Sequence, residues 1–416
     1  MTKKLTFLFV LILSTLTASA NDIEAIRGDV NGDGKVDMDD AKFVTNIILG
    51  TETATKAADV NNDGTVNMPD VMFVINYIKN GKFPDESSKV WPKDLDYSQW
   101  MQYLEDSRLV ADLSLPGAHD AVTAEGWDVS FLNPIAEMTA KCQDLTIQQQ
   151  LEQGVRVFDL RPELTIKDDV DVLRCSHGVM TTVLSVTDFF KKLKTYLAAK
   201  PTEFCIITAQ LSATSSSKME AWAKLFSDII NSEDLKGLFV NFKPRMTVGE
   251  MRGHVLLLSQ EKYADKPVGG YCEGWTSKLE LDEQKKGTII DADGNKSPLW
   301  VQDYWEDITR ENKDAALVRM LEAAAGRDMK ADAPAWVINF PSAYIDGPFS
   351  DNYRKNAAAA NVVAINWLAQ HTGSVGIIYM DFACVDKSMG YDGETEYETA
   401  GKKLVDSVIR QNAKQP

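Results

Sequence analysis

The chain has 416 residues, enough for one barrel-sized domain of about 250 residues and one small module. It carries 44 Lys and Arg against 61 Asp and Glu, a net charge of −17. This balance argues against nucleic acid as a partner and provides no attraction to an acidic membrane. The five cysteines are odd in number and show no Cys-x-x-Cys spacing, which excludes a disulfide framework and a zinc site.

Residues 1–20 have the pattern of a cleavable secretory signal. Lys3 and Lys4 are followed by an apolar run over 5–16 and by small residues that end at Ala20. The run is too short to span a bilayer, which requires about 20 apolar residues. We therefore expect a secreted, extracellular protein.

A twelve-residue pattern occurs twice, as DVNGDGKVDMDD at 29–40 and as DVNNDGTVNMPD at 59–70. Each copy has Asp, Asn and Asp at its first, third and fifth places, Gly at the sixth and a carboxylate at the twelfth. Calcium takes six or more oxygen ligands, and such a loop wraps them around one ion. Two polar turns would be the simpler explanation, but the shared spacing argues against it. The expected ligands are Asp29, Asn31, Asp33, Lys35, Asp40, Asp59, Asn61, Asp63, Thr65 and Asp70.

The twelfth place holds Asp rather than Glu, and no clear helix precedes either loop. In both respects residues 26–81 resemble dockerin modules, whose duplicated loop-helix halves bind calcium and dock onto cohesin domains. The resemblance implies two structural Ca²⁺ ions and a cohesin-type protein partner, which would tether the chain to a surface or an assembly. We assign residues 21–82 to this small, all-α, EF-hand-like module and 83–95 to a linker.

Residues 96–416 alternate between short β-rich runs and helical stretches, the pattern of a parallel sheet covered by helices. The runs end at Leu115, Leu160, Ser176, Leu211, Ser259, Trp305, Phe340 and Phe382. Eight runs predict an α/β fold of the TIM-like (β/α) barrel type. A doubly wound open sheet is the alternative.

Polar residues stand where a barrel would place catalytic groups, at the C-terminal ends of its strands. The ends of the first three runs carry His119, Asp120, Asp159, Arg161 and His177. Two histidines can serve as base and acid in one reaction, because their ordinary pKa lies near neutrality. His254 begins a strand and His371 ends a helix, so we expect both to be structural.

Five segments resemble the X domain of phosphatidylinositol-specific phospholipase C, bacterial type: SLPGAHDAVT, TIQQQLEQGVRVFDLRPEL, LRCSHG, KPTEFCIIT and GIIYMDF. The likeness extends over most of 96–412. It implies that His119 is the general base and His177 the general acid. The reaction would release diacylglycerol and inositol 1,2-cyclic phosphate from phosphatidylinositol or a glycosylated inositol phospholipid. The 2-hydroxyl of inositol is an internal nucleophile, so a base, an acid and a cation such as Arg161 suffice.

The acidic residues of these segments have expected roles as partners. Asp381 orients His119, although it could instead cap the turn that follows its strand. Asp120 holds Arg161, and Asp159 pairs with His177 and raises its pKa. Eukaryotic members of the family hold calcium in this region, so Arg161 implies metal-independent catalysis with no cofactor.

The resemblance also implies a lysine at the end of the fourth strand and an Asp-x-Tyr on the sixth, which grip the inositol ring. This chain has Gln210 at the first position and Asp303-Tyr304-Trp305 at the second. We expect Gln210, Asp303 and Trp305 to contact the head group, with a solvated strand end as the alternative for Asp303.

The segment after His119 carries Trp127, Phe131 and Leu132, which would either meet the bilayer or pack as a lid on the barrel.

Two rival functions stay open on the sequence. A glycerophosphodiester phosphodiesterase is also a barrel with two histidines, but it needs metal-binding carboxylates where this chain has Arg161. A surface-displayed binding module without catalysis would not need the histidine pair. The expected partners of this monomeric chain are an inositol phospholipid at a membrane interface and a cohesin-type protein, not nucleic acid.

Overall fold

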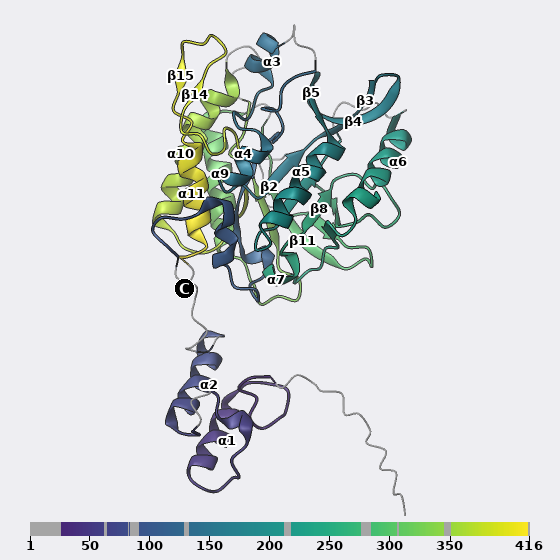
Figure 1. Ribbon diagram of the computed structural model, residues 1–416. Coiled ribbons are helices and arrows are strands. Elements are labelled where there is room, and N and C mark those ends of the chain that lie inside the picture. Colours follow the sequence, from purple (N-terminus) through teal and green to yellow (C-terminus); the bar gives the residue numbers. More distant parts are fainter. Residues whose placement is uncertain are drawn as a thin grey trace, which may run out of the picture. The chain divides into compact units, whose positions relative to one another are not determined.

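The computed structural model describes residues 26–61, 65–81, 83, 91–128, 133–211, 218–275, 284–305, 308–344 and 351–414. The expected signal over 1–20, Asp63, the rim residues Phe131 and Leu132, and most of the expected linker lie outside these residues. The chain divides into two compact units, Met1–Ser88 and Lys89–Pro416, shown in Figure 1. None of the described helices is long and apolar enough to cross a membrane.

The small unit is built from the two sequence repeats. Its elements are α1 (Met38–Ile48), a short 3₁₀ turn (Lys56–Ala58) and α2 (Met68–Asn80). Equivalent valines of the two halves, Val30 with Val60 and Val44 with Val74, lie buried in one shared core. Phe83, at the start of the expected linker, packs into the same core and stacks on Tyr77.

Nine strands of the large unit close into a barrel, which excludes the open-sheet alternative. Around the barrel they are β6 (Cys205–Ala209), β2 (Val157–Leu160), β1 (Ser114–Ala118), β13 (Gly376–Met380), β12 (Trp336–Asn339), β11 (Lys296–Gln302), β10 (Gly287–Ile290), β9 (Gly270–Glu273) and β8 (Val255–Ser259), and β8 pairs with β6 to close the ring. Only β10 runs antiparallel to its neighbours among these strands. A further short strand, β7 (Phe239–Val240), pairs with β8.

The third predicted run is a strand, but its assignment to the barrel was wrong. It forms β4 (Val170–His177), which lies between β3 (Pro162–Lys167) and β5 (Met180–Ser185) in a separate antiparallel sheet. A two-residue loop at Asp168 and Asp169, both with positive φ, folds β4 back on β3, which a parallel barrel strand cannot do. The sequence also missed two barrel strands, β9 and β10.

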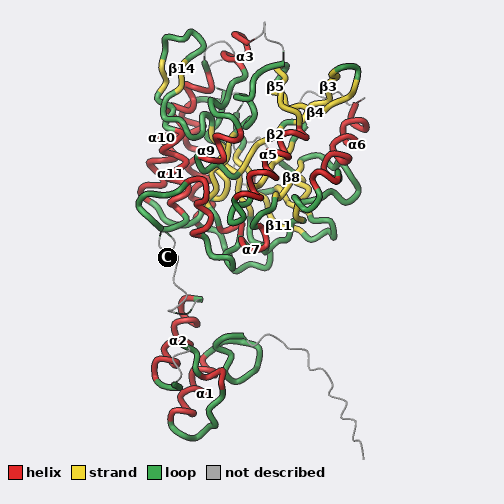
Figure 2. Tube along the Cα trace, viewed as in Figure 1, coloured by secondary structure: helices red, strands yellow, loops and turns green. Residues whose placement is uncertain are grey.

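Helices cover the outside of the barrel, as the red tubes around the yellow strands show in Figure 2. They are α3 (Asn133–Thr139), α4 (Ile147–Glu152), α5 (Val186–Ala199), α6 (Met219–Ile230), α7 (Val248–Met251), α9 (Arg310–Ala325), α10 (Asn352–Gln370) and α11 (Gly401–Gln411). Short 3₁₀ turns cover Tyr97–Tyr103, Val110–Asp112 and Glu233–Leu235, and the hairpin of β14 (Ser388–Met389) and β15 (Glu396–Tyr397) follows β13. In α5 the buried positions include Val186, Phe189, Phe190 and Leu193, the spacing of one apolar helix face.

The barrel interior is filled by side chains of facing strands. Tyr379 of β13 is fully buried and shares a hydrogen bond of 2.7 Å with the Thr208 hydroxyl of β6. Its ring fits because Gly117 of β1, its partner in register, has no side chain. A Cβ there would lie 2.7 Å from the Tyr379 ring. This packing fixes β1 against β13, the two strands that lead into His119 and Asp381.

A buried ion pair joins strand β2 to the segment before β6. Arg156 and Glu203 are fully buried, and the guanidinium reaches the Glu203 carboxylate at 2.7 and 2.9 Å. Arg156 also donates to the carbonyl oxygens of Leu151 and Val155. We expect Glu203→Ala to destabilise the protein by about 3–5 kcal/mol, because the arginine would keep a buried charge without its partner.

Denaturant unfolding followed by tryptophan fluorescence measures this loss of unfolding free energy. Asp228→Ala is the matched control, because it breaks the exposed Lys224–Asp228 pair of α6 and should cost less than about 1 kcal/mol. Equal losses in the two variants would contradict the role of the buried pair.

Candidate active site

His119 follows β1 directly and is held by an aspartate from the neighbouring strand. Ala118 and Met380 are partners in the parallel register, so His119 and Asp381 leave adjacent strand ends side by side. The His119 Nδ1 lies 2.7 Å from Asp381 Oδ1, as expected from the sequence. Because the carboxylate accepts this hydrogen bond, Nδ1 carries the proton, and Nε2 is the nitrogen that can take up another.

Arg161 lies beside that nitrogen, with carboxylates on its other sides. Its Nη2 lies 2.9 Å from His119 Nε2 and 2.9 Å from Asp159 Oδ2, while its Nε lies 3.0 Å from Asp120 Oδ1. The amide of Gln210, oriented with its oxygen toward the guanidinium, accepts from Nε at 2.8 Å. Burial opposes the charge on Arg161, but the two carboxylates outweigh it and raise the pKa above its ordinary value.

His177 reaches the same site from outside the barrel, at the end of β4. Its Nδ1 lies 2.7 Å from the carbonyl oxygen of Ala140, and its Nε2 lies 3.0 Å from the hydroxyl of Tyr353. The ring centroids of His119 and His177 are 6.2 Å apart. The expected pair of Asp159 with His177 is wrong, because Asp159 binds Arg161 and the carboxylate nearest to His177 is Asp120, at 3.5 Å.

The two histidines have opposite electrostatic environments although both are buried. Burial lowers the pKa of His119, but the Asp120 and Asp381 carboxylates outweigh it and raise that pKa above its ordinary value. For His177 burial dominates, with help from Arg161 and His119, and lowers the pKa despite the attraction of Asp120. The shifts therefore favour a proton on His119 over one on His177, which is the distribution reached after proton transfer to His119 and from His177.

The site opens into a cavity of about 570 Å³. Its walls include the expected residues Gln210, Asp303 and Trp305, together with Gln260, Trp275, Tyr344 and Tyr353, which the sequence did not single out. Asp303 accepts a hydrogen bond from the indole nitrogen of Trp275 at 2.9 Å, and burial raises the pKa of its carboxyl group. Trp275 was missed because it follows β9, one of the two strands that the sequence did not reveal.

Several residues of this site are of the types that can bind a metal ion and lie close together. Three overlapping sets could each surround one ion: His119 with Cys142 and Asp381, Asp120 with Cys142 and His177, and His119 with Asp120 and Asp159. The guanidinium of Arg161 already binds Asp120 and Asp159, so its fixed charge neutralises the carboxylates of the second and third sets. Asp381, the carboxylate of the first set, is bound to His119 Nδ1.

The first of the two expected calcium loops, in the small unit, is closed by hydrogen bonds from its backbone to its carboxylates. The Asp29 carboxylate accepts from the backbone nitrogens of Gly32, Asp33 and Gly34 at 2.8–3.0 Å. Asp40 at the twelfth place is fully buried and accepts from Val30, Asn31 and Asp37 backbone nitrogens, which closes the loop on the start of α1.

The second loop closes in the same way. Asp70 is fully buried and accepts from the backbone nitrogens of Asn61 and Asn67. The oxygen-rich donor set of the described residues fits calcium.

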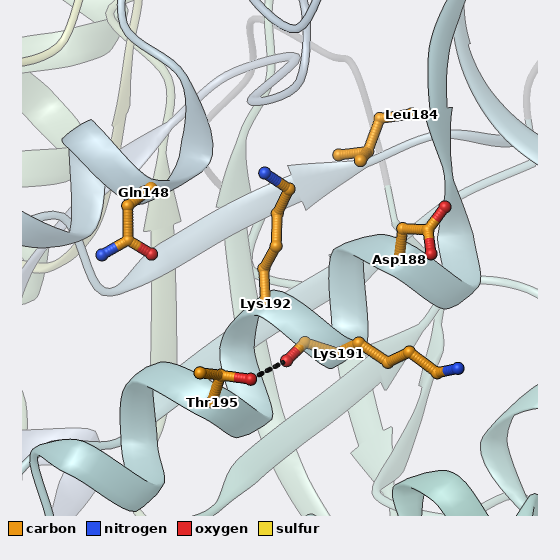
Figure 3. A pocket seen from close by; sticks show the side chains of 6 residues that line it. All are labelled: Gln148, Leu184, Asp188, Lys191, Lys192 and Thr195. Atoms are coloured by element: carbon orange, nitrogen blue, oxygen red, sulfur yellow. Dashed lines mark hydrogen bonds between the residues drawn. The ribbon is translucent and has the colours of Figure 1, made fainter.

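Features elsewhere in the described residues add no chemistry to this site. The rings of His254 and His371 hydrogen-bond to the backbone carbonyls of Gly237 and Trp367, and His371 also stacks on the Trp367 ring. The hollow drawn in Figure 3 lies along α5, where Lys191 and Lys192 already face the carboxylates of Asp234 and Glu125.

Trp127 packs within the protein, although its contacts are with α3, the segment after it and β5 rather than with the barrel strands. The indole is buried, at 8% exposure, against Ala136, Ala140 and Met180.

Known proteins resemble both units of the chain. Residues 27–79 match the model of the dockerin type I domain. The chain is 24% identical over 297 residues to the 1-phosphatidylinositol phosphodiesterase of Staphylococcus aureus strain Newman, covering 68% of this chain and 88% of that protein. It is 24% identical over 301 residues to the enzyme of the same name from Listeria monocytogenes, covering 70% of this chain and 84% of that protein.

Solved structures give the same result for the fold. Phosphatidylinositol-specific phospholipase C from S. aureus superposes with a TM-score of 0.60 at 21% identity, covering 75% of this chain and 97% of that one. The L. monocytogenes enzyme superposes with a TM-score of 0.55 at 20% identity, covering 76% and 99%. The large unit therefore has the TIM-like barrel fold of these phospholipases C and is related to them in sequence.

The pKa of His119 provides a test of the site's electrostatics. We expect Asp381→Asn to lower it, because one of the two carboxylates that stabilise the imidazolium is removed. NMR titration of the ring signals measures the change, with His119→Ala and His177→Ala to assign them. The pKa of His119 is raised in the folded state, so protonation of His119 stabilises the fold. This contribution to the free energy of unfolding is complete below the pKa of the unfolded state and is lost as the pH rises through the pKa of the folded state. An unchanged His119 titration in Asp381→Asn would contradict this assignment.

Proposed function

We propose that the large unit is a secreted phospholipase C that cleaves phosphatidylinositol or a glycosylated inositol phospholipid. The products are diacylglycerol and inositol 1,2-cyclic phosphate. The observation that carries this proposal is geometric: His119, Arg161 and His177 line one cavity, and Arg161 Nη2 lies 2.9 Å from His119 Nε2. A phosphodiester with an internal hydroxyl needs these three groups and no other reactant.

In the proposed reaction His119 Nε2 takes the proton of the inositol 2-hydroxyl, and Asp381 stabilises the imidazolium that forms. The 2-oxygen attacks phosphorus while Arg161 donates to a phosphate oxygen, which places fixed positive charge where negative charge develops. His177 provides the proton for the departing glycerol oxygen. Asp120 and Asp159 hold the guanidinium in place throughout, since they contact it at 3.0 and 2.9 Å.

The head group would lie against Gln210, Asp303 and Trp305. Carboxamide and carboxylate oxygens accept hydrogen bonds from ring hydroxyls, and the indole offers an apolar face to the ring carbons. Gln210 stands where the resemblance implies a lysine. The side chain that would contact the inositol ring at this position is therefore uncharged in this chain.

Apolar side chains at the same end of the barrel would meet the membrane. Val179, two residues beyond His177, is 87% exposed at the β4–β5 turn, and Val183 of β5 and Ile135 of α3 are also exposed. In Figure 1, α3 and β5 lie at the same end of the large unit. Such side chains suit a lipid interface without requiring basic charge.

The small unit would bind two Ca²⁺ ions and dock the enzyme onto a cohesin-type partner. The match to the dockerin type I domain and the closed loops of Asp40 and Asp70 support this role. In this assignment residues 21–82 form the module, and the barrel domain of 96–416 works without a metal.

The first test is phosphorus NMR of the full chain with phosphatidylinositol in mixed micelles, with EDTA present. We expect the signal of a cyclic inositol phosphate, reduced by at least about 10²-fold in His119→Ala and in His177→Ala, because each removes one proton transfer. His254→Ala, far from the site, is the control and should keep full activity. No cyclic product from the unmodified chain would move the substrate to another phosphodiester or favour a binding module without catalysis.

The calcium sites are tested by isothermal titration of the full chain with Ca²⁺. We expect two ions per chain, and one ion after Asp29→Ala, because the first-place carboxylate is lost from one loop only. Asp228→Ala, on the surface of the large unit, should leave both sites intact. Two ions in Asp29→Ala would contradict the ligand assignment.

A further inference from the structure

The proton on His177 can be assigned from its contacts. Its Nδ1 lies 2.7 Å from the carbonyl oxygen of Ala140, which can only accept a hydrogen bond. Nδ1 therefore carries a proton whether the ring is neutral or charged. The nitrogen that gains and loses a proton during catalysis is Nε2, on the opposite side of the ring.

The Nε2 of His177 does not face the cavity freely, because the Tyr353 hydroxyl lies 3.0 Å from it. Tyr353 stands in the first turn of α10 and lines the same cavity as His119 and Arg161. Its ring centroid is 5.2 Å from that of His177 and 6.1 Å from that of His119. Burial raises the pKa of Tyr353 well above its ordinary value, so its oxygen keeps its proton.

The backbone that places Tyr353 is strained and firmly held. Asp351, two residues earlier, is a non-glycine residue in the left-handed region at φ 52° and is buried. Its carboxylate accepts from Arg354 Nη1 at 2.8 Å, and Arg354 Nε donates to the Ser388 hydroxyl at 2.9 Å. Strain of this kind persists where surrounding contacts enforce it, often at functional sites.

We propose that Tyr353 is a third catalytic group, which relays the proton of His177 to the leaving oxygen. The inference rests on the proposed phospholipase C reaction. In the charged form, His177 Nε2–H donates to the Tyr353 oxygen, which leaves the tyrosine O–H free to donate to the glycerol oxygen in the cavity.

The relay balances protons and bonds. His119 takes the 2-hydroxyl proton as the new O–P bond forms and the glycerol O–P bond breaks. Tyr353 gives its proton to the departing oxygen and receives the proton of His177 Nε2. The step ends with charged His119, neutral His177 and Tyr353 protonated as before.

Tyr353→Phe in the full chain tests the relay with two substrates that differ in their leaving group. Phosphatidylinositol expels a glycerol oxygen that needs a proton, whereas the 4-nitrophenyl ester of inositol 1-phosphate expels a stable phenolate that does not. We expect kcat to fall by about 10²-fold or more on the lipid and by less than about 5-fold on the nitrophenyl ester. His177→Ala should show the same selective loss.

Tyr344→Phe is the matched control, because it removes another tyrosine hydroxyl from the same cavity wall. Its effect should be of similar size on both substrates. An equally small loss for Tyr353→Phe on the lipid and on the ester would overturn the relay, while the unmodified enzyme's cyclic product would still uphold the proposed function.

A second measurement separates a relay from a merely structural contact with His177. In mixtures of H₂O and D₂O, a relay moves two protons at the leaving group, so the lipid rate should depend non-linearly on the deuterium fraction. In Tyr353→Phe the dependence of the rate on the deuterium fraction should be closer to linear, because fewer protons are transferred. If both proteins give the same dependence, Tyr353 positions His177 and does not carry its proton.

Discussion

The binding of Arg161 by Asp120 and Asp159 is the constraint on which the site depends. A guanidinium presents its donors in a fixed fork, so two carboxylates on one side determine where its remaining N–H groups point. One of these groups lies 2.9 Å from His119 Nε2, the nitrogen that faces the reaction. Because Asp120 and Asp159 come from the ends of β1 and β2, the barrel itself sets the distance between cation and base.

His177, the proposed acid, is held in a different way from His119, the proposed base. His119, Arg161 and Asp381 stand at the ends of barrel strands, whose register is fixed on both sides. His177 stands on a separate antiparallel sheet that reaches over the barrel end, and Ala140 and Tyr353 hold its two nitrogens. Its position therefore depends on segments far apart in the chain, one before α4 and one at the start of α10.

Much of the architecture could be predicted from the sequence, and the exceptions have physical reasons. Seven of the eight predicted runs are barrel strands, because continuous apolar runs are typical of strands buried on both faces. The remaining run, the third in chain order, was correct as a strand but wrong in its sheet, since pairing depends on partners that a local pattern does not show. The Asp168–Asp169 pair was the available signal for a hairpin.

The two missed strands illustrate a further limit. Strand β10 begins with Gly287, which weakens its strand pattern, yet a Cβ there would lie 2.8 Å from the Leu299 carbonyl of β11. The close approach that requires glycine is thus the feature that concealed the strand. Tyr353 was missed for a related reason. From the sequence alone, a tyrosine in the first turn of a helix cannot be distinguished from an ordinary surface or core residue, because its neighbours in space are not known.

In the proposed reaction, one positive charge is lost from His177 and another appears on His119. The proposed reaction begins with His177 protonated and His119 neutral, the opposite of the distribution that the pKa shifts favour. In that form two cations, Arg161 and His177, face the carboxylates of Asp120, Asp159 and Asp381, so the site offers no surplus of positive charge to an anionic phosphodiester. In the proposed mechanism, deprotonation of the 2-hydroxyl would make His119 positive beside the phosphate just when that phosphate gains negative charge. The attraction would then be strongest in the transition state, which would accelerate the reaction without tightening the binding of the substrate.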